Sequence, residues 1–259
     1  MARFSANLGF LWPDRPLLDR IDAAAAAGFR AIELHWPYDF PPQDVRARCE
    51  ALGLTLLGIN TSPGDTGKGE FGRAALAGCR QAFEADFEQA LDWVRLAGAS
   101  AIHVMAGVVE PARNDEAQAV LVENLKQAAA RAPDMTLLLE GINQRDKPGY
   151  FYSTIEKKAD IIRQIGASNV KIMFDAYHVG IAEGDIFTRL KTHLPLIAHV
   201  QIAAVPSRAE PDEGEIHYGN LINELDRLGY RGWVGCEYKP RAGTDEGLHW
   251  VQDLGVRLY

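Results

Sequence analysis

Short apolar runs alternate along the chain with longer stretches in which apolar residues recur every three or four positions. Each apolar run ends on a polar or small residue, which is typical of parallel strands buried on both faces. The predicted strands cover residues 3–10, 31–36, 54–60, 101–106, 136–142, 170–175, 197–203 and 232–238. The predicted helices cover residues 17–28, 44–53, 83–98, 115–132, 154–166, 187–194, 218–229 and 244–256.

These eight strand–helix units in 259 residues predict an α/β fold, a (β/α)8 TIM barrel that forms a single domain over residues 1–259. A doubly wound sheet also alternates, but the first strand–helix turn, residues 7–16, lacks the G-x-G-x-x-G pattern of dinucleotide-binding folds. The glycine-rich segment 62–78 is not a phosphate-binding P-loop, because Lys68 is followed by Gly69 rather than Ser or Thr. We interpret this segment as a long mobile loop after the third strand, which is either a lid over a site or an ordinary surface loop.

Composition narrows the class of partner. With 47 % hydrophobic residues the chain has ample material for a core, and its net charge of −8 argues against a nucleic-acid partner. A small anionic substrate remains possible, since it meets only the local field of its pocket. Three widely spaced cysteines form no disulfide framework, and no apolar run reaches the ~18 residues of a membrane span. We expect a cytoplasmic protein without a membrane partner; self-association is a further expectation, although the sequence points to no interface.

Polar residues stand where four consecutive predicted strands end. They are Glu140, Asp175, Gln201 and Glu237. In a (β/α)8 barrel the carboxyl ends of the strands form the active site, so these side chains should converge. Their oxygens suit a hard divalent cation such as Mg²⁺ or Mn²⁺, which would also offset the repulsion among three carboxylates. For any one acid, a helix N-terminus or an arginine is an alternative partner.

Basic groups follow three of these strands. His178 lies three residues after Asp175, Arg208 follows strand seven, and Lys239 follows Glu237 by two residues. An acidic protein that binds an anionic substrate needs such groups in addition to a metal, so we predict substrate contacts for all three. His103 and His199 also lie on strands, and we interpret them as core residues.

Seven segments together resemble the hydroxypyruvate isomerase family, which belongs to the xylose-isomerase-like barrels. They are RFSANL (3–8), GFRAIELHWPYD (28–39), LVENL (121–125), LLLEGIN (137–143), KIMFDAYH (171–178), HVQIA (199–203) and GWVGCEYKP (232–240). The resemblance runs from about residue 3 to residue 250. It implies a divalent-metal site whose ligands are matched position by position as Glu140, Asp175, Gln201 and Glu237. Ketose 3-epimerases and apurinic endonucleases share this barrel.

The resemblance also implies roles. Glu140 and Glu237 correspond to the pair of glutamates that together accept and donate the proton. His178 and Arg208 are similar to residues that contact substrate oxygens in the related epimerases. Those epimerases have a histidine where Gln201 stands. After strand seven the chain reads QIAAVPSRAEP, so that Ala204 replaces an aspartate usual in the isomerases. This departure bears on the substrate more than on the chemistry.

The expected reaction interconverts hydroxypyruvate and 2-hydroxy-3-oxopropanoate through an enediolate, with the metal polarising the carbonyl. A 2-oxo-tetronate isomerase or a ketose 3-epimerase on the same barrel is the nearest alternative. A zinc endonuclease would need several histidine-rich metal clusters and a basic face. A non-catalytic sugar-acid binding protein would not need two potential proton carriers.

Overall fold

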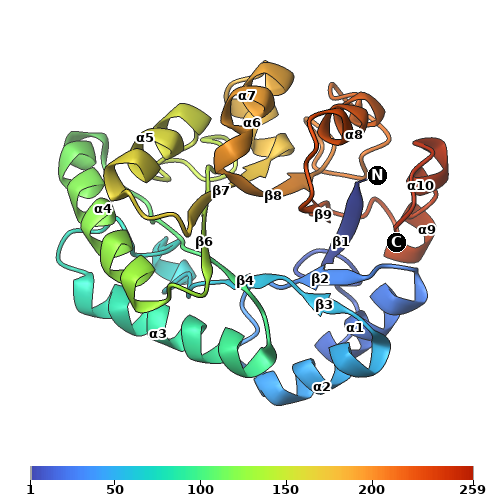
Figure 1. Cartoon of the computed structure of the whole chain (residues 1–259), viewed down its shortest axis with the longest axis horizontal. Helices are drawn as coiled ribbons and strands as arrows, with labels where there is room; N and C mark the ends of the chain where they lie inside the picture. Colours follow the sequence, from blue (N-terminus) through green and yellow to red (C-terminus); the bar gives the residue numbers. More distant parts are fainter. Residues whose placement is uncertain (1, 259) are drawn as a thin grey trace.

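Parallel strands form one nearly closed sheet, and helices surround it as an outer ring (Figure 1). The structure, a computed structural model, describes residues 2–258. The strands are β1 (Arg3–Asn7), β2 (Ala31–Glu33), β3 (Thr55–Leu56), β4 (Gly58–Asn60), β5 (Ala101–His103), β6 (Thr136–Glu140), β7 (Val170–Asp175), β8 (Ile197–Ile202) and β9 (Trp233–Cys236). The helices are α1 (Leu17–Ala26), α2 (Pro42–Leu52), α3 (Arg80–Ala97), α4 (Asn114–Arg131), α5 (Ile155–Ile165), α6 (Ala176–Ala182), α7 (Ile186–His193), α8 (Tyr218–Arg227), α9 (Thr244–Gly247) and α10 (Trp250–Asp253). Three short 3-10 helices are η1 (Thr66–Lys68), η2 (Pro111–Arg113) and η3 (Leu194–Leu196).

The sheet closes where the third predicted strand is divided into β3 and β4. The strand order runs β3-β2-β1-β9-β8-β7-β6-β5-β4, so its two ends are consecutive segments of the chain. Leu57 joins them: its N–H donates to the Ile32 carbonyl at 2.9 Å, and its own carbonyl accepts from the Ala101 N–H at 3.1 Å. The predicted (β/α)8 barrel is therefore confirmed, with one strand interrupted at a single residue.

Two helical predictions differ from the structure. The predicted helix 244–256 is two short helices, α9 and α10. Helix α6 was not predicted: it begins directly after β7, where the Asp175 carboxylate accepts a hydrogen bond from the Tyr177 N–H at 2.8 Å. This is an N-cap interaction, which satisfies a backbone donor that the first helical turn leaves free.

The apolar core lies between the strands and the helices, whereas the inside of the barrel is largely polar. Helix α5 shows how the outer layer forms: Ile155, Ile161 and Ile165 face inward, and the Thr154 hydroxyl caps the N-terminus. Polar and charged side chains are buried in and around the barrel, among them Ser5, Asn7, Glu33, His103, Glu140, Asp175, His199, Gln201 and Glu237. The interior can therefore hold a site rather than a packed apolar plug.

The glycine-rich segment 62–78 is anchored at its second half. Gly72 forms an antiparallel bridge with Ala106, and the Ala74 carbonyl accepts a hydrogen bond from the Asn124 side chain at 2.8 Å. Gly72 has a φ of 97°, and a Cβ there would lie 2.4 Å from the Met105 carbonyl oxygen. The segment thus packs against the loop after β5, and its closing motion stays a prediction.

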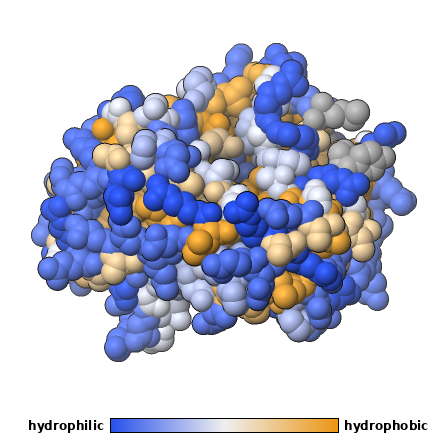
Figure 2. Space-filling model, turned by 60° about the horizontal axis from the view of Figure 1, so that its bottom comes forward, coloured by the Kyte–Doolittle hydropathy of each residue, from blue (hydrophilic) through white to orange (hydrophobic). Residues whose placement is uncertain are grey.

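The surface is mainly hydrophilic on the face shown in Figure 2, where hydrophobic residues appear as separate small areas. Among residues 2–258, no helix combines the length and the apolar character needed to cross a membrane. Large exposed apolar side chains include Trp36 and Phe40, which follow β2.

Replacing Gly58 by Ala tests the closure of the sheet. A Cβ at this position would lie 2.7 Å from the Ala101 carbonyl oxygen, so the β4–β5 pairing must shift. We expect the free energy of unfolding to fall by about 1–3 kcal/mol, as for other overpacked sites. Gly67→Ala is the control, because that residue is exposed and its Cβ would meet only the Asp65 side chain, at 3.2 Å. Urea denaturation of both variants measures the difference, and equal stabilities would contradict this account of the closure.

Candidate active site

The four predicted oxygen donors lie together at the carboxyl ends of consecutive strands. Glu140 ends β6, Asp175 ends β7, Gln201 lies in β8 and Glu237 directly follows β9. The register pairs Asp175 with Gln201, and Gln201 with Gly235. All four side chains belong to residues that are at most 6 % exposed. The twofold alternation of side chains along each strand turns these positions toward the barrel interior.

Glu140, Asp175 and His178 form the tightest cluster. One ligand atom from each lies within 4.8 Å of the other two. His178 Nε2 is 3.7 Å from a Glu140 oxygen and 3.6 Å from Asp175 Oδ2. Asp175 Oδ1 accepts from the Tyr177 N–H at the start of α6, while Oδ2 is buried without a hydrogen-bond partner in the described part of the chain. A buried acceptor without a donor is costly, so this oxygen is a natural ligand for a cation.

Asn143 fixes the orientation of the His178 ring. The Asn143 N–H donates to His178 Nδ1 at 3.2 Å, and the Asn143 amide nitrogen lies 2.7 Å from the same atom. Nδ1 therefore accepts, and in the neutral ring the proton sits on Nε2, which faces the two carboxylates. Burial, aided by the charge of Arg208, lowers the pKa of His178 to about 3, so the ring is neutral at physiological pH.

Three donors hold Glu237. Asn7 donates to Oε1 at 3.1 Å, His35 Nε2 lies 3.0 Å from the same oxygen, and an Arg208 guanidinium N–H donates to Oε2 at 3.1 Å. Burial raises the pKa of Glu237, but the hydrogen bond from His35 and the charge of Arg208 outweigh it and lower the pKa to about 2. This carboxylate is therefore ionised.

Glu140 and Asp175 differ from Glu237 in the direction of their pKa shifts. Burial raises the pKa of Glu140 well above its usual value, and the charges of Glu237 and Asp175 raise it further. Burial and the charge of Glu237 raise the pKa of Asp175 to about 7. One cavity thus contains a glutamate that is firmly ionised and a glutamate that retains a proton readily, which is the arrangement that acid–base catalysis requires.

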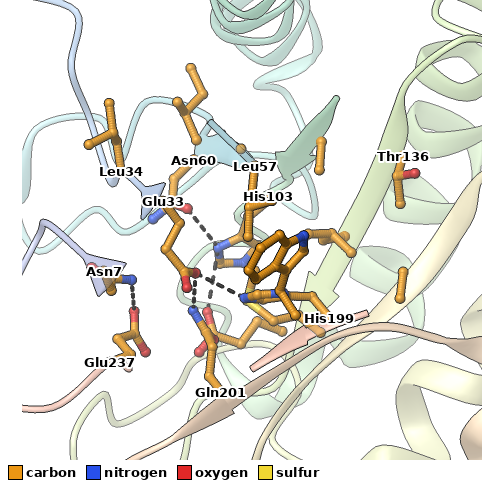
Figure 3. A pocket seen from close by; sticks show the side chains of 18 of the residues that line it. Asn7, Glu33, Leu34, Leu57, Asn60, His103, Thr136, His199, Gln201 and Glu237 are labelled. Carbon is orange, nitrogen blue, oxygen red and sulfur yellow. Dashed lines mark hydrogen bonds and ion pairs between the residues drawn. The ribbon is translucent and has the colours of Figure 1, made fainter. Parts of the chain in front are cut away.

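Glu33 is the centre of a second buried network, which it forms with Gln201 and His199 (Figure 3). Its Oε2 accepts from His199 Nε2 at 3.0 Å and from the Gln201 amide nitrogen at 2.9 Å, and its Oε1 accepts from the Ser5 hydroxyl at 3.0 Å. A Glu33 carboxylate oxygen accepts from the Gln201 amide nitrogen, so the NH₂ group of Gln201 faces Glu33. Gln201 Oε1 is left buried without a hydrogen-bond partner among residues 2–258.

Gly235 makes room for this network. A Cβ at Gly235 would lie 2.1 Å from a Glu33 oxygen and 2.9 Å from His199 Nε2. His199, which we predicted to be a core residue, is buried as expected but is bonded to Glu33. Burial lowers the pKa of His199, but the charge and hydrogen bond of Glu33 outweigh this and raise it overall.

His103 is likewise buried and lies in the site. Its Nδ1 is 3.4 Å from Glu140 and 3.3 Å from the Asn60 side-chain oxygen, while its Nε2 has no hydrogen-bond partner among the described residues. Burial lowers its pKa to about 3. Asn7, Glu33, His35 and Asn60 also belong to the site, and the sequence analysis assigned them no role; their polarity near the ends of the predicted strands was the available signal.

Arg208 is clamped at the mouth of the site. Its guanidinium lies 4.8 Å from the ring centroid of Phe10 and 4.9 Å from that of Tyr177, and it is 3.5 Å from Asp146 Oδ2. Its φ of 58° is in the left-handed region. Lys239 differs: its backbone N–H donates to the Arg208 carbonyl at 2.8 Å, but its side chain is exposed and lines neither of the two cavities at the site.

The two cavities share several residues. The outer one has a volume of about 480 Å³ and is lined on one side by Glu140, His178, Arg208 and Glu237. The inner one, of about 150 Å³, extends down the barrel past Glu33 and His199 to Thr136 and Trp233 (Figure 3). A small polar molecule in the outer cavity would therefore lie directly against both glutamates.

The sequence and the structure of the chain are similar to those of known proteins. Residues 21–254 match the Xylose isomerase-like TIM barrel family. The chain is 46 % identical to a 2-oxo-tetronate isomerase from Cupriavidus necator, over 97 % of this chain and 98 % of the relative. It is 40 % identical to a putative hydroxypyruvate isomerase from Homo sapiens, over 98 % and 96 %. A crystal structure of an AP endonuclease, family 2, from Brucella melitensis superposes with a TM-score of 0.95 at 37 % identity, covering 98 % of this chain and 99 % of that one.

Substituting Glu33 by Gln tests the network that Glu33 forms with Gln201 and His199. The new side chain has nearly the same shape but is neutral and carries an NH₂ group that faces donors. We expect the free energy of unfolding to fall by about 1.5–3 kcal/mol, the contribution of hydrogen bonds to a charged group. Ser5→Ala removes one of the three donors and should cost less. Urea denaturation compares the two, and a Glu33→Gln variant as stable as the parent would contradict the assigned network.

Proposed function

The chain belongs to the xylose isomerase-like TIM barrel family, and we propose that its reaction interconverts hydroxypyruvate and 2-hydroxy-3-oxopropanoate. Like its relatives, it is an isomerase of the aldose–ketose type. The observation that carries the proposal is the pair of buried glutamates in one cavity: Glu237 is held by Asn7, His35 and Arg208, and Glu140 lies beside His103 and His178. A binding protein has no need of two such groups.

The same proposal includes a divalent cation, Mg²⁺ or Mn²⁺. Glu140, Asp175, Gln201 and Glu237 would hold it. Two observations support this donor set: Asp175 Oδ2 and Gln201 Oε1 are both buried oxygens without a donor. Oxygen ligands of this kind suit hard cations. When bound, the cation supplies a Lewis acid that polarises the substrate carbonyl and stabilises negative charge on the neighbouring oxygens.

The protein's own groups handle the protons. Glu237, ionised by its three donors, removes the proton from C3 of hydroxypyruvate. A proton is returned to C2 by Glu140 or by Glu237 itself; if Glu140 delivers it, a proton must pass from Glu237 to Glu140 before the next turnover. A C3–H bond is broken and a C2–H bond is formed, while the hydroxyl proton moves from the C3 oxygen to the C2 oxygen. His178 presents its Nε2 proton toward this region and donates a hydrogen bond to a substrate oxygen.

A four-carbon acid is the second candidate substrate. The outer cavity of about 480 Å³ has room beyond a three-carbon acid. The relative with 46 % identity is named a 2-oxo-tetronate isomerase, and Ala204, where we expected an aspartate, is buried beside this site. The glutamates and the proton transfers are the same for either acid.

Other functions fit less well. Ketose 3-epimerases are expected to carry a histidine where Gln201 stands. A DNA-cleaving enzyme needs a basic face, which a net charge of −8 does not favour. We also propose a cytoplasmic location, supported by three cysteines that are all free thiols.

The direct test is an isomerase assay on metal-stripped protein, with hydroxypyruvate and 2-oxo-tetronate offered separately. We expect no turnover without metal and restored turnover with Mg²⁺ or Mn²⁺, because the cation stabilises the charge that develops on oxygen. Turnover of the four-carbon acid alone would assign the second candidate. Full activity in the presence of a chelator would contradict the metal site, and cleavage of abasic DNA without isomerisation would contradict the function.

Glu237→Gln keeps the shape of the side chain and removes the base. We expect kcat to fall at least about 100-fold, the usual contribution of a general base, with the fold intact by circular dichroism. Glu123→Gln, on the exposed face of α4, is the matched control and should leave kcat unchanged. A Glu237→Gln variant that keeps more than about a tenth of the activity is incompatible with an essential proton carrier.

A further inference from the structure

We propose that Lys147 forms the subsite for the substrate carboxylate and selects acids over neutral sugars. The inference rests on the proposed function, since it assumes that the outer cavity holds a small acid. Two basic side chains, Lys147 and Arg208, line that cavity together with three carboxylates, Glu140, Asp146 and Glu237. An anionic substrate entering such a cavity needs a cation whose charge is not already offset.

The charge of Arg208 is already offset within the protein. Its guanidinium donates to Glu237 at 3.1 Å and lies 3.5 Å from Asp146, and the rings of Phe10 and Tyr177 lie against it. Its Nε is buried without a hydrogen-bond partner among residues 2–258, but moving the terminal nitrogens toward a substrate carboxylate would remove their contacts with Glu237 and Asp146. Arg208 is therefore better suited to hold Glu237 than to bind the acid.

Lys147 is free to take this role. Its side chain is half-buried in the wall of the outer cavity, and no carboxylate of residues 2–258 forms an ion pair with it. Its ammonium group lies 4.7 Å from the ring centroid of Phe71, which also lines the cavity. A cation above an aromatic ring keeps donors available, because the ring uses none of its N–H groups.

The loop that carries Lys147 is braced on the catalytic side. The Lys147 N–H donates to the Asn143 carbonyl at 3.1 Å, and Asn143 also holds the His178 ring. Asp146, the preceding residue, accepts a hydrogen bond from the Tyr177 hydroxyl at 2.8 Å. One loop therefore positions the substrate-facing histidine and the free ammonium, which sets the distance between the reacting carbons and the carboxylate.

Phe71, the aromatic residue beside Lys147, links the proposed subsite to the glycine-rich segment. Phe71 belongs to segment 62–78, and its ring packs edge-on against Trp36 and Tyr150 at 6.1 Å in each case. A carboxylate bound at Lys147 would lie beside this aromatic wall. The segment that we interpret as either a lid or a surface loop thus contacts the cavity at the position where the acid would bind.

The test measures binding and turnover separately in the metal-loaded, full-length protein. Hydroxypyruvate binding is followed by the fluorescence of Trp36, which lines the cavity, and by calorimetry. For Lys147→Met we expect the dissociation constant and KM to rise about tenfold while kcat changes less than about threefold, because a uniform binding contact is removed. Lys147→Arg should restore both, and Lys126→Met, exposed on α4 and outside the cavity, is the matched control.

Three readouts separate charge recognition from a structural role. The KM of the parent enzyme should rise with salt, and that of Lys147→Met should rise less, because screening acts on the lost charge. Dihydroxyacetone, the neutral analogue in which CH₂OH replaces the carboxylate, should inhibit both proteins equally. Phe71→Leu, which removes the ring but keeps the ammonium, should raise KM less than Lys147→Met.

Opposite results would overturn the inference. An unchanged KM in Lys147→Met, or equal weakening of hydroxypyruvate and dihydroxyacetone, would show that Lys147 does not recognise the acid. A parent protein that binds hydroxypyruvate through Lys147 but does not isomerise it would contradict the proposed function and leave the subsite intact. A parent protein that binds no acid would contradict both.

Discussion

Four carboxylates, those of Glu33, Glu140, Asp175 and Glu237, are buried in and around one barrel, and their mutual repulsion must be offset by the rest of the site. Two of them are fully supplied with donors from neighbouring strands. Glu33 and Glu237 each accept from three side chains, and the Arg208 guanidinium is one of the three donors to Glu237. The remaining two, Glu140 and Asp175, have raised pKa values, and Asp175 Oδ2 has no hydrogen-bond partner among residues 2–258, which is the arrangement expected of a site that a cation completes.

A buried lysine on a surrounding helix lies near the same buried carboxylates. Lys158 of α5 is 1 % exposed, and its ammonium lies 3.4 Å from the Met173 carbonyl. Burial lowers its pKa to about 8, although the charges of Glu140 and other acids act in the opposite direction. The charged interior is tolerable because the stabilising apolar layer lies elsewhere, between strands and helices, and because glycines such as Gly235 leave space for the polar network.

The sequence was sufficient for the barrel and for the positions of the four oxygen donors, because both follow from the alternation of strands and helices and from which residue ends each strand. The sequence did not predict the hydrogen-bond networks inside the barrel. The pairing of Glu33 with His199 and Gln201 depends on strand register, which periodicity does not determine. The interruption at Leu57 depends on how the sheet closes. The choice between Lys239 and Lys147 depends on loop conformation, so adjacency to Glu237 in the chain was a poor guide to which lysine lines the cavity.

The proposed metal site depends most on the orientation of Gln201. Glu33 accepts a hydrogen bond from the NH₂ group of Gln201, which leaves Gln201 Oε1 for a cation. Crystals grown with Mn²⁺ and measured for anomalous scattering would locate the metal without reference to activity. We expect one buried peak, with Glu140, Asp175, Glu237 and the oxygen of Gln201 as ligands at about 2.0–2.3 Å. A manganese peak remote from these residues, or a bound ion that Gln201 does not ligate, would contradict the central claim.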